Sequence, residues 1–222
     1  MISDPAKGVT SNANRQTPLT KKILAEAAAF LATGDAGLAQ ILERNGPPPL
    51  WSRKPGFVTL IRIILEQQVS LASADAMYRR LFVSVEPLSP ETILAVGVPG
   101  LRSLGLTRQK ASYLVHVADA IRTGGLNLRR VAKSKDVTAI EMLTSVKGIG
   151  PWTARIYLLM ALRRPDVWPT GDIALAAAVC RLRGLEKRPG SEELADLATA
   201  WRPHRATAAR MLWQFYLTGM SE

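Results

Sequence analysis

Apolar residues recur along most of this chain at the three- and four-residue spacing of amphipathic helices. The clearest case is the stripe Phe57, Leu60, Ile61, Ile64 and Leu65, which lies on one face of a helix that begins near residue 57. No segment has the strict alternation of apolar and polar residues that is typical of a half-buried strand. The pattern therefore predicts an all-α protein of about nine or ten helices.

Capping and turn residues set the expected bounds of these helices. Asp35 and Ser89 are expected N-caps, and Pro90 after Ser89 suits the first helical position. The expected helices span residues 19–31, 35–45, 57–65, 89–94, 107–123, 137–145, 151–163, 172–183, 191–200 and 204–217. Residues 1–17 are polar and lack periodicity, so we expect a flexible tail there and a folded domain over residues 18–222.

Composition narrows the class of protein. The chain has 222 residues, 47% of them hydrophobic, which is enough for a large domain or two small subdomains and excludes disorder over most of its length. The net charge of +11 favours a polyanionic partner, either nucleic acid or an anionic membrane surface. No apolar run reaches the roughly 18–20 residues of a membrane span, and the N-terminus lacks a signal-peptide layout. With Cys180 as its one cysteine, the protein is expected in the reducing cytoplasm, at the nucleoid if it is bacterial, and not at a membrane.

The segment 144–154, which reads TSVKGIGPWTA, lies between two expected helices. Gly148 and Gly150 flank Ile149 and permit a tight turn that also approaches a ligand closely. The amide N–H groups from Gly150 onward lack intrahelical partners and, with the helix dipole, form a site suited to a DNA phosphate. Lys147 is expected near the same phosphate. Alone, the turn is equally compatible with an ordinary connection between two helices.

The hairpin, its continuation Pro151-Trp152-Thr153-Ala154 and Asp172 farther along resemble the helix-hairpin-helix base-excision DNA glycosylases, the HhH-GPD superfamily. The chain is most similar to their 3-methyladenine DNA glycosylase II branch. Over roughly residues 20–219 the resemblance implies two helical subdomains that flank an active-site cleft. About residues 55–124 would form one subdomain, and the N-terminal helices with residues 125–222 the other. It also implies a monomer that acts on damaged double-stranded DNA.

By this resemblance Asp172 is the catalytic residue. When a base leaves, C1′ of the sugar gains oxocarbenium character, which a fixed carboxylate stabilises while it also orients water. The alternative role is a cap for the helix that begins near Ile173. The two roles are compatible, because a helix N-terminus favours a carboxylate anion.

Trp152 separates two branches of the superfamily. In the bifunctional glycosylase/lyases, a lysine two residues after the second hairpin glycine attacks C1′. Trp152 occupies that position here, and an indole is not a nucleophile. The resemblance therefore implies a monofunctional enzyme that leaves an abasic site and cuts no strand. Simple core filling is the alternative role for Trp152.

The segment Gln67-Gln68-Val69-Ser70 follows the first apolar stripe. In the resembled family such a segment ends a helix at the DNA face, and Gln68 falls on the residue that fills the gap left by the flipped nucleotide. A solvated helix end is the alternative. The resemblance places these residues at the DNA: Gln67, Gln68, Ser70, Lys147, Gly148, Ile149, Gly150 and Thr153. A second glycine turn, before Arg108 and Lys110, also matches the family, and these two cations could meet the DNA backbone. A solvated, basic helix start is the equally weighted alternative.

The base pocket is expected to be lined by Trp152, Ile156, Tyr157 and His204, while Trp213 and Phe215 are expected in the core. Aromatic walls suit a methylated purine that carries positive charge. Two positions depart from the family pattern, because Ile156 and His204 stand where aromatic residues are common. The preferred base therefore stays open.

No cofactor or metal is expected. A single cysteine excludes the four-cysteine iron–sulfur cluster of the endonuclease III-like relatives, while the resemblance allows a monovalent cation on the hairpin carbonyls. Two function classes stay open: a glycosylase for alkylated bases, or a non-catalytic helix-hairpin-helix DNA-binding module. A glycosylase for uracil, hypoxanthine or an oxidised base is a narrower alternative. Asp172 favours an enzyme, because a carboxylate that faces a polyanion weakens binding.

Overall fold

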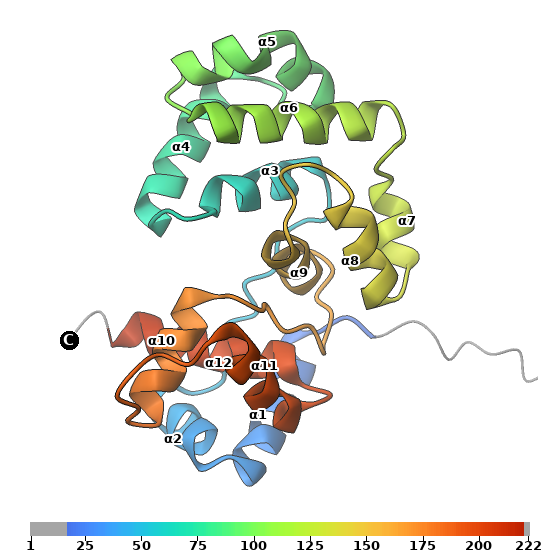
Figure 1. The fold of residues 1–222 in the computed structure, drawn as a ribbon. Coiled ribbons are helices and arrows are strands. Elements are labelled where there is room, and N and C mark those ends of the chain that lie inside the picture. Colours follow the sequence, from blue (N-terminus) through green and yellow to red (C-terminus); the bar gives the residue numbers. More distant parts are fainter. Residues whose placement is uncertain (1–16, 220–222) are drawn as a thin grey trace, which may run out of the picture.

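The computed structural model of the protein describes residues 17–219, and this range is all-helical, as the pattern predicts (Figure 1). Residues 1–16 of the expected tail lie outside the described range. The elements are α1 (Lys21–Gly34), α2 (Ala36–Asn45), α3 (Phe57–Glu66), α4 (Leu71–Ser84), α5 (Pro90–Ser103), α6 (Arg108–Arg122), α7 (Leu128–Lys133), α8 (Asp136–Thr144), α9 (Pro151–Met160), α10 (Ile173–Leu182), α11 (Ser191–Leu197), the 3₁₀ helix η1 (Ala198–Trp201) and α12 (Arg205–Thr218). Between residues 17 and 219, no helix is both long enough and apolar enough to cross a membrane.

The helices pack as two groups, with α9 between them (Figure 1). The first group is α3 to α8, in which α5 lies along α6 and α3 contacts α4 and α6. The second group is α1, α2, α10, α11 and α12. Helix α7 packs on α8, which packs on α9, and α9 in turn contacts α3. Helices α7 and α8 therefore do not pack mainly with α10 to α12. Helices α7 and α8 thus lie on the side of α3, whereas we expected residues 125–222 to pack with the N-terminal helices.

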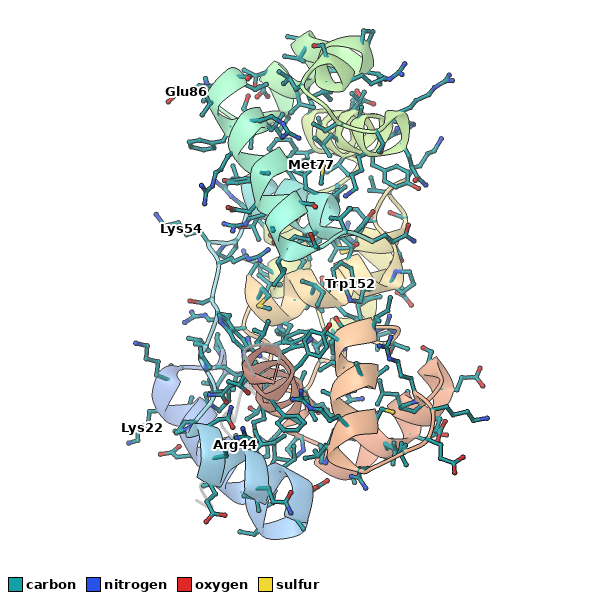
Figure 2. The ribbon with its side chains drawn as sticks, turned by 90° about the vertical axis from the view of Figure 1, so that its left-hand side faces the viewer. Lys22, Arg44, Lys54, Met77, Glu86 and Trp152 are labelled. Carbon is teal, nitrogen blue, oxygen red and sulfur yellow. The ribbon has the colours of Figure 1, made fainter. Side chains whose placement is uncertain are left out.

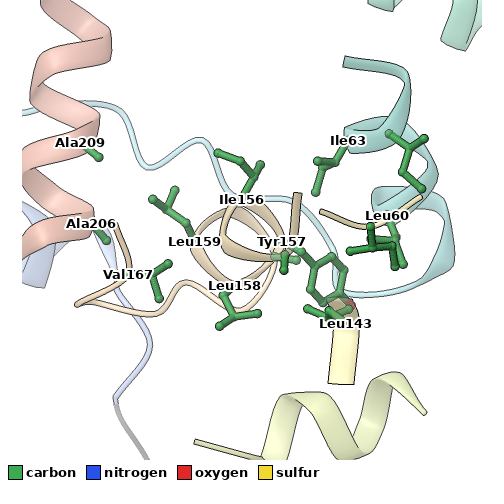
Figure 3. Close-up of a cluster of buried hydrophobic side chains, with 14 of the residues drawn as sticks. Leu60, Ile63, Leu143, Ile156, Tyr157, Leu158, Leu159, Val167, Ala206 and Ala209 are labelled. Carbon is green, nitrogen blue, oxygen red and sulfur yellow. The ribbon is translucent and has the colours of Figure 1, made fainter. Parts of the chain in front are cut away.

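Helix α9 is surrounded by apolar side chains (Figure 3). Four consecutive residues of α9, Ile156 to Leu159, are at most 4% exposed. Their neighbours in the cluster include Leu60 and Ile63 of α3, Leu143 of α8, and Ala206 and Ala209 of α12. Because burying each large apolar side chain contributes about 1.5–3 kcal/mol, this cluster holds α9 firmly between the two groups.

Two helices, α4 and α7, are absent from the expected set. Helix α4 buries only Ala74, Met77 and Leu81, a stripe too narrow for apolar periodicity to detect. Helix α7 has six residues and buries only Val131. Helix α5 also continues beyond its expected end at residue 94, through a break at Gly97 with φ 62°, as far as Ser103.

Residues 46–56, which we call the connecting segment, link α2 to α3 and thereby join the two groups. Arg210 of α12 is fully buried and donates to the carbonyl oxygens of Leu50 (3.0 Å), Leu159 (2.8 Å) and Ala206 (2.9 Å). Within residues 17–219 it has no carboxylate partner. Burial lowers the pKa of Arg210 to about 10, so its guanidinium stays charged at neutral pH. Arg210 thus ties the connecting segment to α9 and α12.

Candidate active site

Asp172 is buried at the N-terminus of α10, with 8% of its surface exposed. Its Oδ1 atom accepts hydrogen bonds from the amide of Leu175 (2.9 Å) and from the indole Nε1 of Trp213 (3.2 Å). Its Oδ2 atom accepts one from the indole Nε1 of Trp152 (2.9 Å). Three N–H donors on two oxygens fix the orientation of the carboxylate. Asp172 therefore caps α10 through the amide of Leu175, as the alternative role predicted, and is held by two indoles at the same time.

The two indole donors come from different helices. Trp152 lies in the first turn of α9 and is half-buried, and Figure 2 shows it at the level where the two helix groups meet. Trp213 belongs to α12 and is 9% exposed. Its burial agrees with the expected core role, but its bond to Asp172 was not predicted. A third tryptophan, Trp51 of the connecting segment, packs edge-to-face on Trp213, with ring centroids 6.5 Å apart. Residue spacing carries no signal for either contact.

The two glycines of the hairpin have different roles. Gly148 has φ +100°, and a Cβ atom there would lie 2.6 Å from Cβ of Tyr113 in α6, so close packing requires glycine. Gly150 begins α9 and has open space around the position of a Cβ atom. In the described part of the chain, the amide N–H groups of Gly150, Trp152 and Thr153 have no acceptor. Together with the exposed Lys147, they leave the start of α9 open to an anion.

The side chains of three residues that we expected at the DNA serve the hairpin itself, which leaves only their backbone groups for a DNA contact. Gln67 donates from Nε2 to the carbonyl of Gly148 (3.0 Å) and to Oγ1 of Thr153 (2.8 Å). Thr153 is 1% exposed and Ile149 is 3% exposed, so neither side chain faces solvent. Gln67 therefore braces the hairpin from the end of α3.

Gln68 stands directly beside this brace and is exposed. Its φ of +54° is unusual for a residue with a side chain, and such strain is frequent at functional sites. Ser70 is also exposed, and its side chain caps α4 by accepting from the amide of Ser73 (3.2 Å). The next residue, Leu71, is 66% exposed. The geometry leaves Gln68 free to project from the protein.

Of the two cations expected to meet DNA at the start of α6, the structure leaves only Arg108 exposed. Lys110 is 8% exposed, and its Nζ donates to the carbonyl of Leu65 in the last turn of α3. Burial lowers the pKa of this amine. Lys110 therefore supports the end of α3 that carries Gln67 and Gln68, and the expected contact with the DNA backbone is wrong.

The expected base pocket also changes. Ile156 and Tyr157 are buried in the core around α9, and the Tyr157 hydroxyl accepts from the amide of Gly56 (3.0 Å). Burial raises the pKa of Tyr157. His204 packs edge-to-face on Phe30, with ring centroids 5.3 Å apart. It is the N-cap of α12 and precedes Trp213 by nine residues, or about 13 Å at about 1.5 Å per residue. These three assignments are therefore wrong, and Trp152 is the expected pocket residue that remains beside Asp172.

Side chains of the usual metal-binding types do not cluster within residues 17–219, and Cys180 is a free thiol. The hairpin carbonyl of Gly148 is occupied by Gln67. A monovalent cation on the remaining hairpin carbonyls stays a prediction.

Comparison with known proteins identifies the family. The HhH-GPD superfamily of base excision DNA repair proteins matches residues 61–203, so the chain belongs to that superfamily. The chain is 27% identical to the Bacillus subtilis protein YfjP, in a match that covers 80% of this chain and 64% of YfjP. It is 28% identical to DNA-3-methyladenine glycosylase 1 of Schizosaccharomyces pombe, over 80% of this chain and 79% of that protein. The chain thus spans less than two thirds of YfjP.

A solved structure agrees with this assignment. The DNA-3-methyladenine glycosidase of Bacillus halodurans superposes with a TM-score of 0.74 and 31% identity, over 88% of this chain and 91% of that one. The helical fold that the sequence predicts is therefore confirmed.

Proposed function

We propose that this protein is a monofunctional DNA glycosylase that removes alkylated bases from double-stranded DNA and leaves an abasic site. 3-Methyladenine and related N-alkylpurines are the proposed substrates. The observation that carries the proposal is the buried carboxylate of Asp172, held by Trp152, Trp213 and the amide of Leu175. Membership of the superfamily and the names of the similar proteins support it.

The proposed reaction is hydrolysis of the N-glycosidic bond. The bond from C1′ to the base nitrogen breaks, its electron pair leaves with the base, and positive charge develops on the sugar. Asp172 stabilises that charge and orients the attacking water, whose hydroxyl joins C1′ while its proton is released. Because three N–H donors hold the carboxylate, little reorganisation is needed as charge develops.

DNA binding is assigned to the open start of α9. The free amides of Gly150, Trp152 and Thr153, with Lys147, would hold a backbone phosphate. Gln68 would fill the space left by the flipped nucleotide. A non-catalytic DNA-binding module is less well supported, since such a module gains nothing from a buried, indole-bound carboxylate beside its phosphate site.

Base release from a set of duplexes tests the proposal. Each duplex carries one lesion, 3-methyladenine, 7-methylguanine, hypoxanthine, uracil or an oxidised base, and the released base and the cleaved strand are measured. Release of the N-alkylpurines supports the proposal. Preferential release of another lesion would favour the narrower alternative, and no release from any duplex would favour a binding module.

Monofunctionality is a separate prediction, because Trp152 occupies the position of the lyase lysine. The product strand should stay intact until hot alkali is added. Borohydride should trap no covalent protein–DNA adduct, since no amine is expected in line with C1′. A trapped adduct from the unmodified protein would contradict this prediction and direct attention to Lys147.

Gly150→Val should weaken binding to undamaged duplex by at least about tenfold. A branched side chain at the start of α9 would keep the phosphate away from the free amides and remove one or two charge-assisted hydrogen bonds, which are worth about 1.5–3 kcal/mol each. The protein should still fold, because a Cβ atom at residue 150 meets nothing within 4 Å. Gly34→Val is the matched control, since residue 34 has the same open space but lies at the end of α1. Affinity is measured between low and high salt and should fall steeply as salt rises. Normal duplex binding by Gly150→Val would refute the hairpin assignment.

A further inference from the structure

Trp51 has an unusual backbone conformation. Its φ is +44°, a region that side chains other than those of glycine and asparagine rarely adopt. Such strain persists only where the surrounding structure imposes it, and it concentrates at ligand-binding and catalytic sites. Three consecutive prolines, residues 47–49, precede this position and favour a stiff, extended connector.

The connecting segment is held on both sides of Trp51. On one side, the carbonyl of Leu50 accepts from Nε of the buried Arg210 (3.0 Å). On the other, the amide of Arg53 donates to the carbonyl of Met160 (3.0 Å), and its guanidinium forms two bonds of 2.9 and 2.8 Å with Glu66. These contacts reach α12, α9 and α3, so the position of Trp51 is fixed by the same helices that build the site.

The indole of Trp51 lies one ring away from the candidate catalytic carboxylate. It packs on Trp213 with an interplanar angle of 64°, and Trp213 donates to Asp172. Trp213 is almost fully buried, whereas Trp51 and Trp152 are only half-buried. Two partly exposed indoles therefore lie near Asp172. Trp152 of α9 donates to the carboxylate, and Trp51 of the connecting segment packs on Trp213.

We propose that Trp51 forms an aromatic wall of the base-binding site and determines the preference for positively charged alkylated purines. The inference rests on the proposed glycosylase function. An electron-rich indole attracts a cationic base through its π face and stacks on any base less strongly. Trp51 would supply the aromatic surface that Ile156, Tyr157 and His204 do not provide.

Two variants separate the ring from the backbone strain. Trp51→Gly removes the ring and accepts the positive φ, while Trp51→Phe retains an aromatic ring. Single-turnover release is measured from duplexes that carry cationic 7-methylguanine or neutral hypoxanthine, together with affinity for an abasic duplex and the melting temperature. Phe82→Ala is the control, an exposed aromatic at the far end of α4.

Trp51→Gly should lower release of the cationic base by roughly tenfold and that of the neutral base by less. Trp51→Phe should retain most of the activity. Affinity for abasic duplex should stay unchanged, because the product site holds no base, while the melting temperature of Trp51→Gly should fall because the ring packs on Trp213. Equal losses on both bases together with weaker abasic binding would mean a structural role and overturn the inference.

The outcomes also separate this inference from the proposed function. A wild-type protein that releases 7-methylguanine beside an equally active Trp51→Gly variant would refute the role of Trp51 alone. A wild-type protein that releases no base from any duplex would refute the glycosylase function and the role of Trp51 together.

Discussion

Asp172→Asn should slow base release by about 10²–10³-fold, or roughly 3–4 kcal/mol, because it removes the anion that we propose stabilises positive charge at C1′. The loss should be smaller for a cationic base such as 3-methyladenine, which is already a good leaving group, than for a neutral base. Affinity for undamaged DNA should hold or increase, since a carboxylate beside the phosphates disappears. Single-turnover release and duplex affinity are the measurements.

The stability of this variant follows from the three hydrogen bonds to Asp172. The amide oxygen of asparagine is able to accept from Leu175 and Trp213, as Oδ1 does. Its NH₂ group would face the indole N–H of Trp152, so that one bond is lost. A loss of about 1.5–3 kcal/mol in the free energy of unfolding is expected, measured by chemical denaturation. Near-wild-type base release by this variant would leave Asp172 as a helix cap and bring the binding-module alternative forward.

Arg210→Met should lower the free energy of unfolding by about 2–6 kcal/mol. Methionine fills much of the same space but leaves the carbonyls of Leu50 and Leu159 without their donor, at about 1–3 kcal/mol each. The carbonyl of Ala206 is an ordinary acceptor within α12 and should lose little. Denaturant unfolding measures the change.

Arg79→Met is the control for this prediction. Arg79 is 79% exposed and pairs with Asp75 one turn earlier in α4, a contact worth at most about 0.5 kcal/mol. If Arg210→Met were as stable as Arg79→Met, the three carbonyl bonds would not be what holds the connecting segment in place.

Helices with wide apolar stripes or clear caps could be predicted from residue order. Helix α3 begins and ends within one residue of its expected bounds, and Asp35 and Ser89 cap α2 and α5 as expected. Helices α4 and α7 were missed because they bury few side chains. A local pattern indicates a helix only where that helix buries a broad face.

Some parts of the candidate site could be predicted from residue order, and others could not. The hairpin, Trp152 and Asp172 are recognisable from residue order because a tight turn, a helix start and a cap are local features. Trp213 meets Asp172 across 41 residues, and Arg210 meets Leu50 across 160. Such contacts, like the burial of Ile156 and Tyr157, depend on how the two helix groups pack around α9. The spacing of residues along one helix holds no information about which distant segment will cover it, so the contact of Trp213 with Asp172 is found only in the folded structure.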